Sequence, residues 1–185
     1  MRLEIHLHAY LEMCEGVTRK QVEKALQPLF EYLDVEGLKE VQSLEQDQPG
    51  MVYHQHEFSL EICCTLEVGG SFFPALEKAM SNIGILLESA TAVEVIIYRD
   101  DASDEMQLIF VGPTPEAIFD AQRRRMSEDV GALLRRHFSE SATREVLDLV
   151  NTLFKREGGK LQGATSEQEA ASPMIAETGG RHRLH

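Results

Sequence analysis

The chain has 185 residues, of which 43% are hydrophobic and none is tryptophan; this is enough for one ordinary folded domain and too apolar for a disordered chain. Its formal net charge is −13, because residues 1–112 hold 20 acidic and 7 basic side chains. Such a surface repels phosphate backbones, and the longest apolar runs are too short to cross a bilayer, so we expect neither a nucleic-acid nor a membrane partner. Three cysteines without framework spacing predict reduced thiols and a cytoplasmic location.

The first predicted elements are a strand and a helix. Residues 2–11 alternate between polar and apolar, as in a strand with one buried face. Thr18, with Gln21 three residues later, has the pattern of a helix capping box. Apolar residues then recur at helical spacing as far as Leu33, and Pro28 inside this run predicts a kink or a restart.

The middle of the chain is predicted to form four more strands, with a helix between the second and the third of them. Residues 37–46 are a weak strand candidate, and residues 51–68 form the longest strand-like run, which we interpret as one strand. A second helix is predicted from Ala75 to Leu87. The stretches 92–99 and 106–111 are joined by an acidic turn and form the clearest hairpin in the sequence.

Two helices are predicted to follow. Thr114 can cap the third helix with Pro115 at its first position. The fourth helix carries an apolar stripe and is expected to end at Gly158-Gly159. Residues 158–185 have few large apolar side chains and no period, which predicts a disordered tail.

The order of these elements predicts an α+β fold. The first six match the split βαβ pattern of the ferredoxin-like architecture, and the crossover rule places strands 2–11 and 92–99 side by side in mid-sheet. We therefore expect a ferredoxin-like antiparallel sheet with an extra edge strand and two C-terminal helices. This single domain would span residues 1–157, with an acidic sheet-and-helix part at 1–112 and a helical pair at 113–157.

Two His-x-His pairs raise the question of a metal site. In a regular strand over 51–68, His54 and His56 share the apolar phase, whereas His6 and His8 lie on the polar side of their own strand. The two pairs would then face opposite sides of the sheet, unless a bulge reversed the phase. We therefore expect no four-histidine site. His54 and His56 alone are a secondary metal candidate, or partly exposed residues near a strand end.

His6 and His8 are the stronger metal candidate because their strand is predicted to be central and their face open. Neighbouring strands would place Glu61 or Cys63 on one side and Glu94 on the other. Imidazole, carboxylate and thiolate groups are suitable donors for zinc or a similar divalent cation. The alternative is that these are ordinary polar residues on a solvated or helix-covered face, because their spacing does not match a defined zinc motif.

Two further groups are candidate sites. Gly69, Gly70 and Ser71 join a strand to a helix, where backbone N–H groups could hold an anion, although glycines also suit a tight turn and the acidic surroundings oppose phosphate. The third helix carries a basic set that could pair with the acidic sheet part, within one chain or across a dimer, or form a solvated face. This set comprises Arg123, Arg124, Arg125, Arg135 and Arg136.

The sequence contains no GxSxG, HExxH, EF-hand or SxxK motif, so it offers no support for an enzyme. Our leading hypothesis is a non-enzymatic, cytoplasmic module for protein interaction or small-ligand sensing. It would be a homodimer, because the open sheet face and the amphipathic C-terminal helices have apolar surface to bury. The alternatives are a divalent-metal protein or metal-dependent enzyme using His6 and His8, and an acidic protein that binds a basic protein partner.

Overall fold

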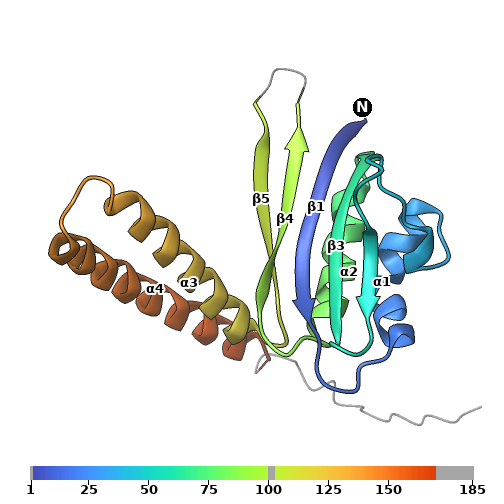
Figure 1. Cartoon of the computed structure of the whole chain (residues 1–185). Helices are drawn as coiled ribbons and strands as arrows, with labels where there is room; N and C mark the ends of the chain where they lie inside the picture. The colour runs from blue at the N-terminus through green and yellow to red at the C-terminus, as the bar shows by residue number, and fades with distance from the viewer. Residues whose placement is uncertain (1, 100–102, 170–185) are drawn as a thin grey trace, which may run out of the picture. The chain divides into compact units, whose positions relative to one another are not determined.

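The computed structural model describes residues 2–99 and 103–169, with side chains as far as Arg156. The chain divides into two compact units, with the boundary between Met126 and Ser127. The first unit is an α+β structure and the second is helical (Figure 1). No helix in the described part of the chain combines the length and the apolar character needed to cross a membrane.

The first unit is built on a five-stranded antiparallel sheet with the strand order β2-β3-β1-β4-β5 (Figure 1). The strands are β1 (Leu3–Glu12), β2 (Gly50–His54), β3 (Ser59–Val68), β4 (Thr91–Tyr98) and β5 (Glu105–Val111). As the crossover rule predicted, β1 pairs with β4 near the middle and β5 lies at an edge. The predicted α+β class is therefore confirmed.

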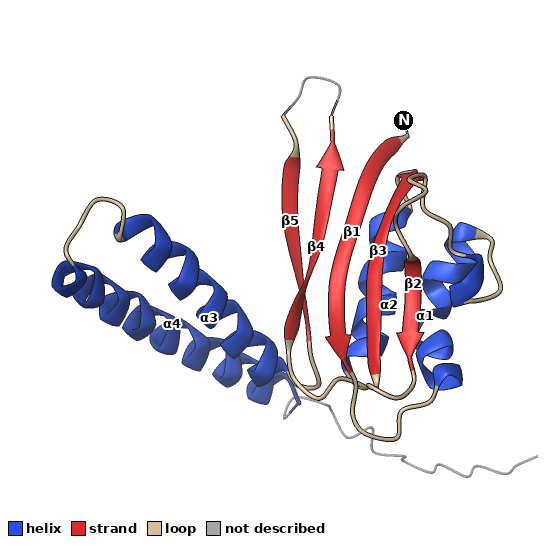
Figure 2. Ribbon diagram, viewed as in Figure 1, coloured by secondary structure: helices blue, strands red, loops and turns tan. Residues whose placement is uncertain are grey.

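Helices α1 (Arg19–Leu33) and α2 (Phe72–Gly84) cover one face of this sheet (Figure 2). The alternation in β1 predicted the covered face correctly, because its apolar residues are buried there and its polar residues point the other way. The core contains Ile5, Leu7 and Leu11 from β1, Leu26 and Leu29 from α1, and Phe72, Leu76 and Ile83 from α2, all with 0–1% exposure.

The predicted capping box fixes the start of α1. Thr18 Oγ1 accepts a hydrogen bond from the N–H of Gln21 at 3.4 Å, and Gln21 Oε1 accepts one from the N–H of Thr18 at 2.9 Å. The helix then continues through Pro28 to its end at Leu33, so the predicted restart is wrong. Helix continuation is tolerated because proline removes one donor without preventing the flanking residues from packing on α2 and the sheet.

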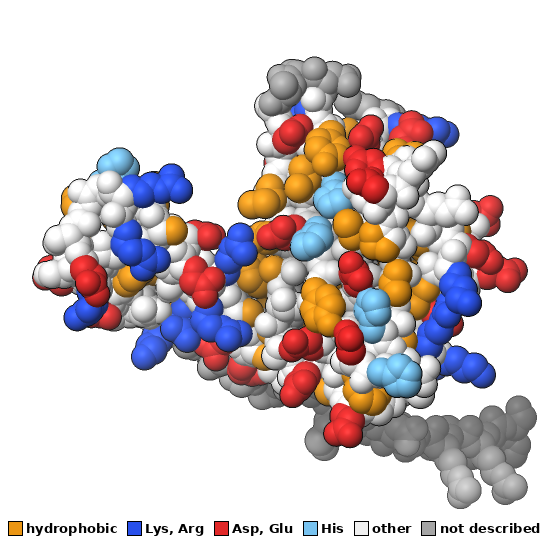
Figure 3. All heavy atoms as spheres, in the orientation of Figure 1, with side chains coloured by type: hydrophobic (Ala, Val, Ile, Leu, Met, Phe, Trp, Pro, Cys, Tyr) orange, Lys and Arg blue, Asp and Glu red, His pale blue; other side chains and the backbone are white. Residues whose placement is uncertain are grey.

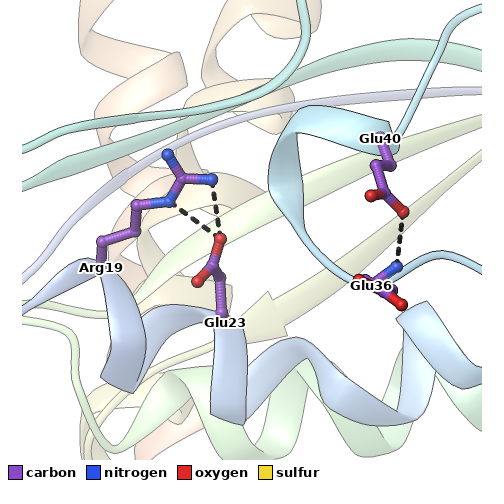
Figure 4. Close-up of polar contacts among 4 residues, drawn as sticks. All are labelled: Arg19, Glu23, Glu36 and Glu40. Atoms are coloured by element: carbon purple, nitrogen blue, oxygen red, sulfur yellow. Dashed lines mark hydrogen bonds and ion pairs between the residues drawn. The ribbon is translucent and has the colours of Figure 1, made fainter.

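Charged side chains support α1 and the loop that follows it (Figure 4). The guanidinium of Arg19 donates from Nε and Nη2 to Glu23 Oε1 at 2.8 and 2.7 Å, one helical turn along. After the helix, the carboxylate of Glu40 accepts the backbone N–H of Glu36 at 2.8 Å. These contacts fix the chain near the short 3₁₀ helix η1 (Leu38–Glu40), which stands where a strand was predicted over 37–46.

The run 51–68 is a hairpin, so its interpretation as one strand is wrong. β2 ends at His54, residues 55–58 form a turn, and Phe58 has a φ of 47°. A turn starts a new alternation, so the faces of the two strands are not those of one continuous strand. The large side chain of β2 that enters the core is that of Met51, which is 3% exposed and lies opposite the buried Ile62.

The second unit contains α4 (Glu140–Glu169) and the part of α3 (Pro115–Leu134) that starts at Ser127. α3 begins at the predicted cap, where Thr114 Oγ1 accepts the N–H of Ala117 at 3.2 Å. α4 continues past Gly158 and Gly159, so its predicted end is wrong; glycine weakens a helix by about 1 kcal/mol but does not by itself stop one. The remainder of the predicted tail, residues 170–185, lies outside the described residues.

Candidate functional site

The sheet face opposite α1 and α2, here called the open face, carries most of the predicted metal ligands. Figure 3 looks onto this face and shows histidine side chains among acidic and hydrophobic ones. The register places His8 of β1 opposite Cys63 of β3 and opposite Glu94 of β4. His8, Cys63 and Glu94 therefore form one row across three strands, as the sequence predicted.

Within this row the contacts are loose. His8 Nδ1 lies 3.9 Å from Glu94 Oε2, and the His8 side chain is 59% exposed. The rings of His6 and His8 stand nearly parallel, with centroids 6.4 Å apart. Burial raises the pKa of the Cys63 thiol, with smaller contributions from Glu61 and two acidic residues of the loop before β2.

His6 is engaged by a polar network instead. Its Nδ1 lies 3.1 Å from the hydroxyl oxygen of Thr65, which is fully buried on β3. That hydroxyl donates to Gln48 Oε1 at 3.1 Å, and the backbone N–H of Thr65 donates to Ser43 Oγ at 2.8 Å. The loop before β2 is thus attached to the open face beside His6, so the imidazole has a structural role at this position.

The predicted face of His54 is wrong, whereas the predicted place of His54 and His56 near a strand end is confirmed. His54 lies in β2 opposite Ser59, and its Nε2 lies 3.1 Å from Glu61 Oε2, so it shares the open face with Glu61. His56 is exposed in the turn. His54 and His8 are four residues apart along the strands, which is about 13 Å, and two strands apart across the sheet, which is about 10 Å. The four imidazoles therefore do not converge, although for a different reason from the one predicted.

Sequence reasoning missed the pair formed by His54 and Glu61. The signal was length, because a strand over 51–68 would be far longer than the usual range of about three to ten residues. The polar residues Gln55, His56 and Glu57 in its middle are the natural position for a turn.

These positions bear directly on the zinc hypothesis. Nowhere in the described part of the chain do three or more His, Cys, Asp or Glu side chains group closely enough to hold a metal ion. We expect elemental analysis of the purified protein after incubation with zinc and desalting to give substoichiometric metal. Stoichiometric zinc that is lost in His8→Ala and kept in the control His137→Ala, which changes an exposed histidine of the second unit, would contradict this expectation.

The predicted anion loop is already engaged by protein groups. The backbone N–H of Gly69 donates to the hydroxyl oxygen of Tyr32 at 2.6 Å. Ser71 is the N-cap of α2 but makes no side-chain capping hydrogen bond, and α2 starts at Phe72, three residues earlier than predicted. Gly69 and Gly70 therefore serve the connection between β3 and α2.

The five candidate arginines have different surroundings. Arg125 Nη2 lies 3.9 Å from Glu94 Oε1, so one of them meets an acidic residue of the sheet as predicted. Arg123 Nε lies 3.4 Å from Asp120 Oδ1 on its own helix. Arg124, Arg135 and Arg136 are exposed. Exposed pairs of this kind contribute about 0–1 kcal/mol each, so they do not define a site.

The end of α3 and α4 form an antiparallel helical hairpin, defined here as residues 127–156. Ser127 Oγ lies 3.3 Å from Asn151 Oδ1, and the Cα of Gly131 faces Leu147 closely enough that an added Cβ would lie 3.4 Å from its Cδ1. The apolar residues along this line are only partly buried: Leu134, Leu147, Val150 and Phe154. No hydrophobic side chain within residues 127–156 is buried.

A second apolar stripe lies beside that line. Leu133 and Val146 each precede an inward-facing residue by one position, which rotates them about 100° around their helices. Because the two helices run in opposite directions, the same offset brings these side chains to the same side of the hairpin. This surface, here called the apolar face, consists of Leu133, Val146, Leu149 and Leu153, which are 58%, 40%, 59% and 39% exposed.

The other side of the hairpin is charged. Its side chains each come one position after an inward-facing residue, which rotates them to the side opposite the apolar face. All of them are exposed: Glu128, Arg135, Arg144, Asp148 and Lys155. The hairpin is therefore amphipathic as a unit, with one apolar face and one charged side. The sequence predicted the apolar stripes of both helices but not that they join into one surface.

The chain matches one family model over both the sheet unit and the hairpin. A family model described as a family of unknown function, DUF6806, matches residues 3–155, which is most of the chain. The chain belongs to DUF6806. No curated protein and no solved structure matches it.

The DUF6806 match extends from β1 to the second half of α4. The region common to the family therefore includes both the sheet unit and the helical hairpin with its apolar face. The hairpin, residues 127–156, thus lies almost entirely within the residues that the DUF6806 model matches.

Proposed function

We propose that this protein is a non-enzymatic protein-interaction module that binds its partner through the apolar face of the helical hairpin. The observation that carries the proposal is that no hydrophobic side chain in residues 127–156 is buried, whereas four large ones lie exposed on one face. Helices in proteins gain most of their stability from burying an apolar face, at about 25 cal/mol per Å². A partner on the apolar face would provide that burial.

The sheet unit enters the proposal as a ferredoxin-like scaffold in the cytoplasm. The order of β1 to β4 with α1 and α2, and the central pairing of β1 with β4, support the architecture. Three cysteines, all free, support the location. Architecture of this kind carries many unrelated functions, so the functional part of the proposal depends on the hairpin.

The proposal is tested with the full chain in the cells that make it. Val146→Lys with Leu153→Lys places two charges on the apolar face and puts lysine, a good helix former, at both positions. After chemical cross-linking, the wild-type chain is expected in a complex of higher mass, and the double variant is expected as the single chain. Burial of unpaired charges in the interface is the physical reason.

The matched control is Glu128→Lys with Asp148→Lys, which introduces the same residues on the charged side of the hairpin. This control is expected to keep the complex. The proposal fails if the wild-type chain forms no complex, or if the complex survives in the Val146→Lys, Leu153→Lys variant. Circular dichroism of all three proteins checks that the sheet and helices remain folded.

A further inference from the structure

We infer that the partner is a second copy of this chain, and that two hairpins pack through their apolar faces as a four-helix bundle. This inference rests on the proposed function, because it uses the same face. It adds the identity of the partner and the geometry of the complex.

The first argument is the shape of the surface. Leu133 comes from α3, and Val146, Leu149 and Leu153 come from α4, so the uncovered layer is two antiparallel helices wide. A layer of this width is covered completely by another pair of antiparallel helices, with neighbouring axes about 8–10 Å apart. A second copy of residues 127–156 is such a pair and carries the same apolar side chains.

The second argument is charge. Residues 1–126 hold 22 acidic and 10 basic side chains, a net charge of −12, whereas residues 127–156 hold 5 of each and are neutral. Two copies that approach through their sheet units meet strong like-charge repulsion. Two copies that approach through their hairpins do not, so the hairpin is the part of the chain suited to self-association.

The open face of the sheet is the competing surface for a dimer. It carries Glu61 and Glu94 beside its histidines, and Tyr10 and Met106 are its exposed apolar residues, at 49% and 57%. Acidic side chains opposed across a two-fold axis would repel over the screening length, about 8 Å at physiological salt. Residues 127–156 are neutral overall, with 5 acidic and 5 basic side chains, which favours the apolar face over the open face.

The test is the mass of the purified full chain in solution, measured by light scattering during size exclusion. The wild-type protein is expected at twice the chain mass of 20.8 kDa. Val146→Lys with Leu153→Lys is expected to weaken the dimer at least about 100-fold, because both charges enter the apolar interface. The control Glu128→Lys with Asp148→Lys is expected to remain a dimer.

Salt separates this dimer from one held by ion pairs. Raising the ionic strength screens the repulsion between the two acidic units, so the dissociation constant is expected to stay constant or fall. A monomeric wild-type protein, a dimer that survives in the Val146→Lys, Leu153→Lys variant, or a dimer that dissociates with salt would each overturn the inference. If the purified chain is a monomer but its cellular complex is lost in that variant, the proposed function stands and the second copy is ruled out.

Discussion

Replacement of Phe72 by alanine is expected to lower the free energy of unfolding by about 3–5 kcal/mol. Phe72 is fully buried at the first position of α2, and its ring meets that of Tyr32 edge-on with centroids 5.5 Å apart. Its removal leaves a cavity between α1 and α2, and it frees the tyrosine whose hydroxyl oxygen accepts the N–H of Gly69. Urea denaturation followed by circular dichroism measures the loss.

The matched control for Phe72→Ala is Ile85→Ala, directly after the end of α2. Ile85 is 73% exposed, so its truncation is expected to change the free energy of unfolding by less than about 0.5 kcal/mol. Equal losses in the two variants would contradict the packing of α1 and α2 on the sheet described above.

Gly50→Ala is expected to cost at least about 2 kcal/mol of stability. Gly50 opens β2 with a φ of +79°, where a side chain is strained, and a Cβ there would lie 2.5 Å from the carbonyl oxygen of Val41. The backbone must therefore shift at the point where the chain enters β2. Because β2 positions His54 beside Glu61, this variant is also expected to disturb their contact, visible as a changed imidazole signal in NMR.

Gly70→Ala is the control for Gly50→Ala. Gly70 has no positive φ, and an added Cβ would meet no atom within 4 Å. Its replacement is expected to leave stability within about 0.5 kcal/mol of the wild-type value. A tolerated alanine at position 50 would show that β2 does not start with the backbone conformation described here.

Several parts of the fold were predictable because the determining interactions are local. The alternation in β1 fixed its buried face, since the side chains of a strand point to opposite sides in turn. Thr18 with Gln21, and Thr114 before Pro115, fixed the starts of two helices through hydrogen bonds that span only three residues.

Other parts depended on contacts between distant residues. The turn before β3 needs Phe58 in a left-handed conformation, and its carbonyl oxygen accepts the N–H of Met13 at 2.7 Å, an interaction with no local signature. The stretch 37–46 contains η1 and lies beside β3, with the N–H of Leu44 donating to the oxygen of Thr65 at 2.9 Å. Propensity alone could not distinguish this arrangement from a strand.

The sequence by itself determined the α+β class, the acidic first part and the apolar stripes of the last two helices, because composition and periodicity are properties of the chain alone. Only the tertiary structure decided which face carries His54, which side chains meet His6, and that the stripes of α3 and α4 join into one apolar face. The reason is that register and the relative rotation of packed helices are set by contacts between segments far apart in the sequence.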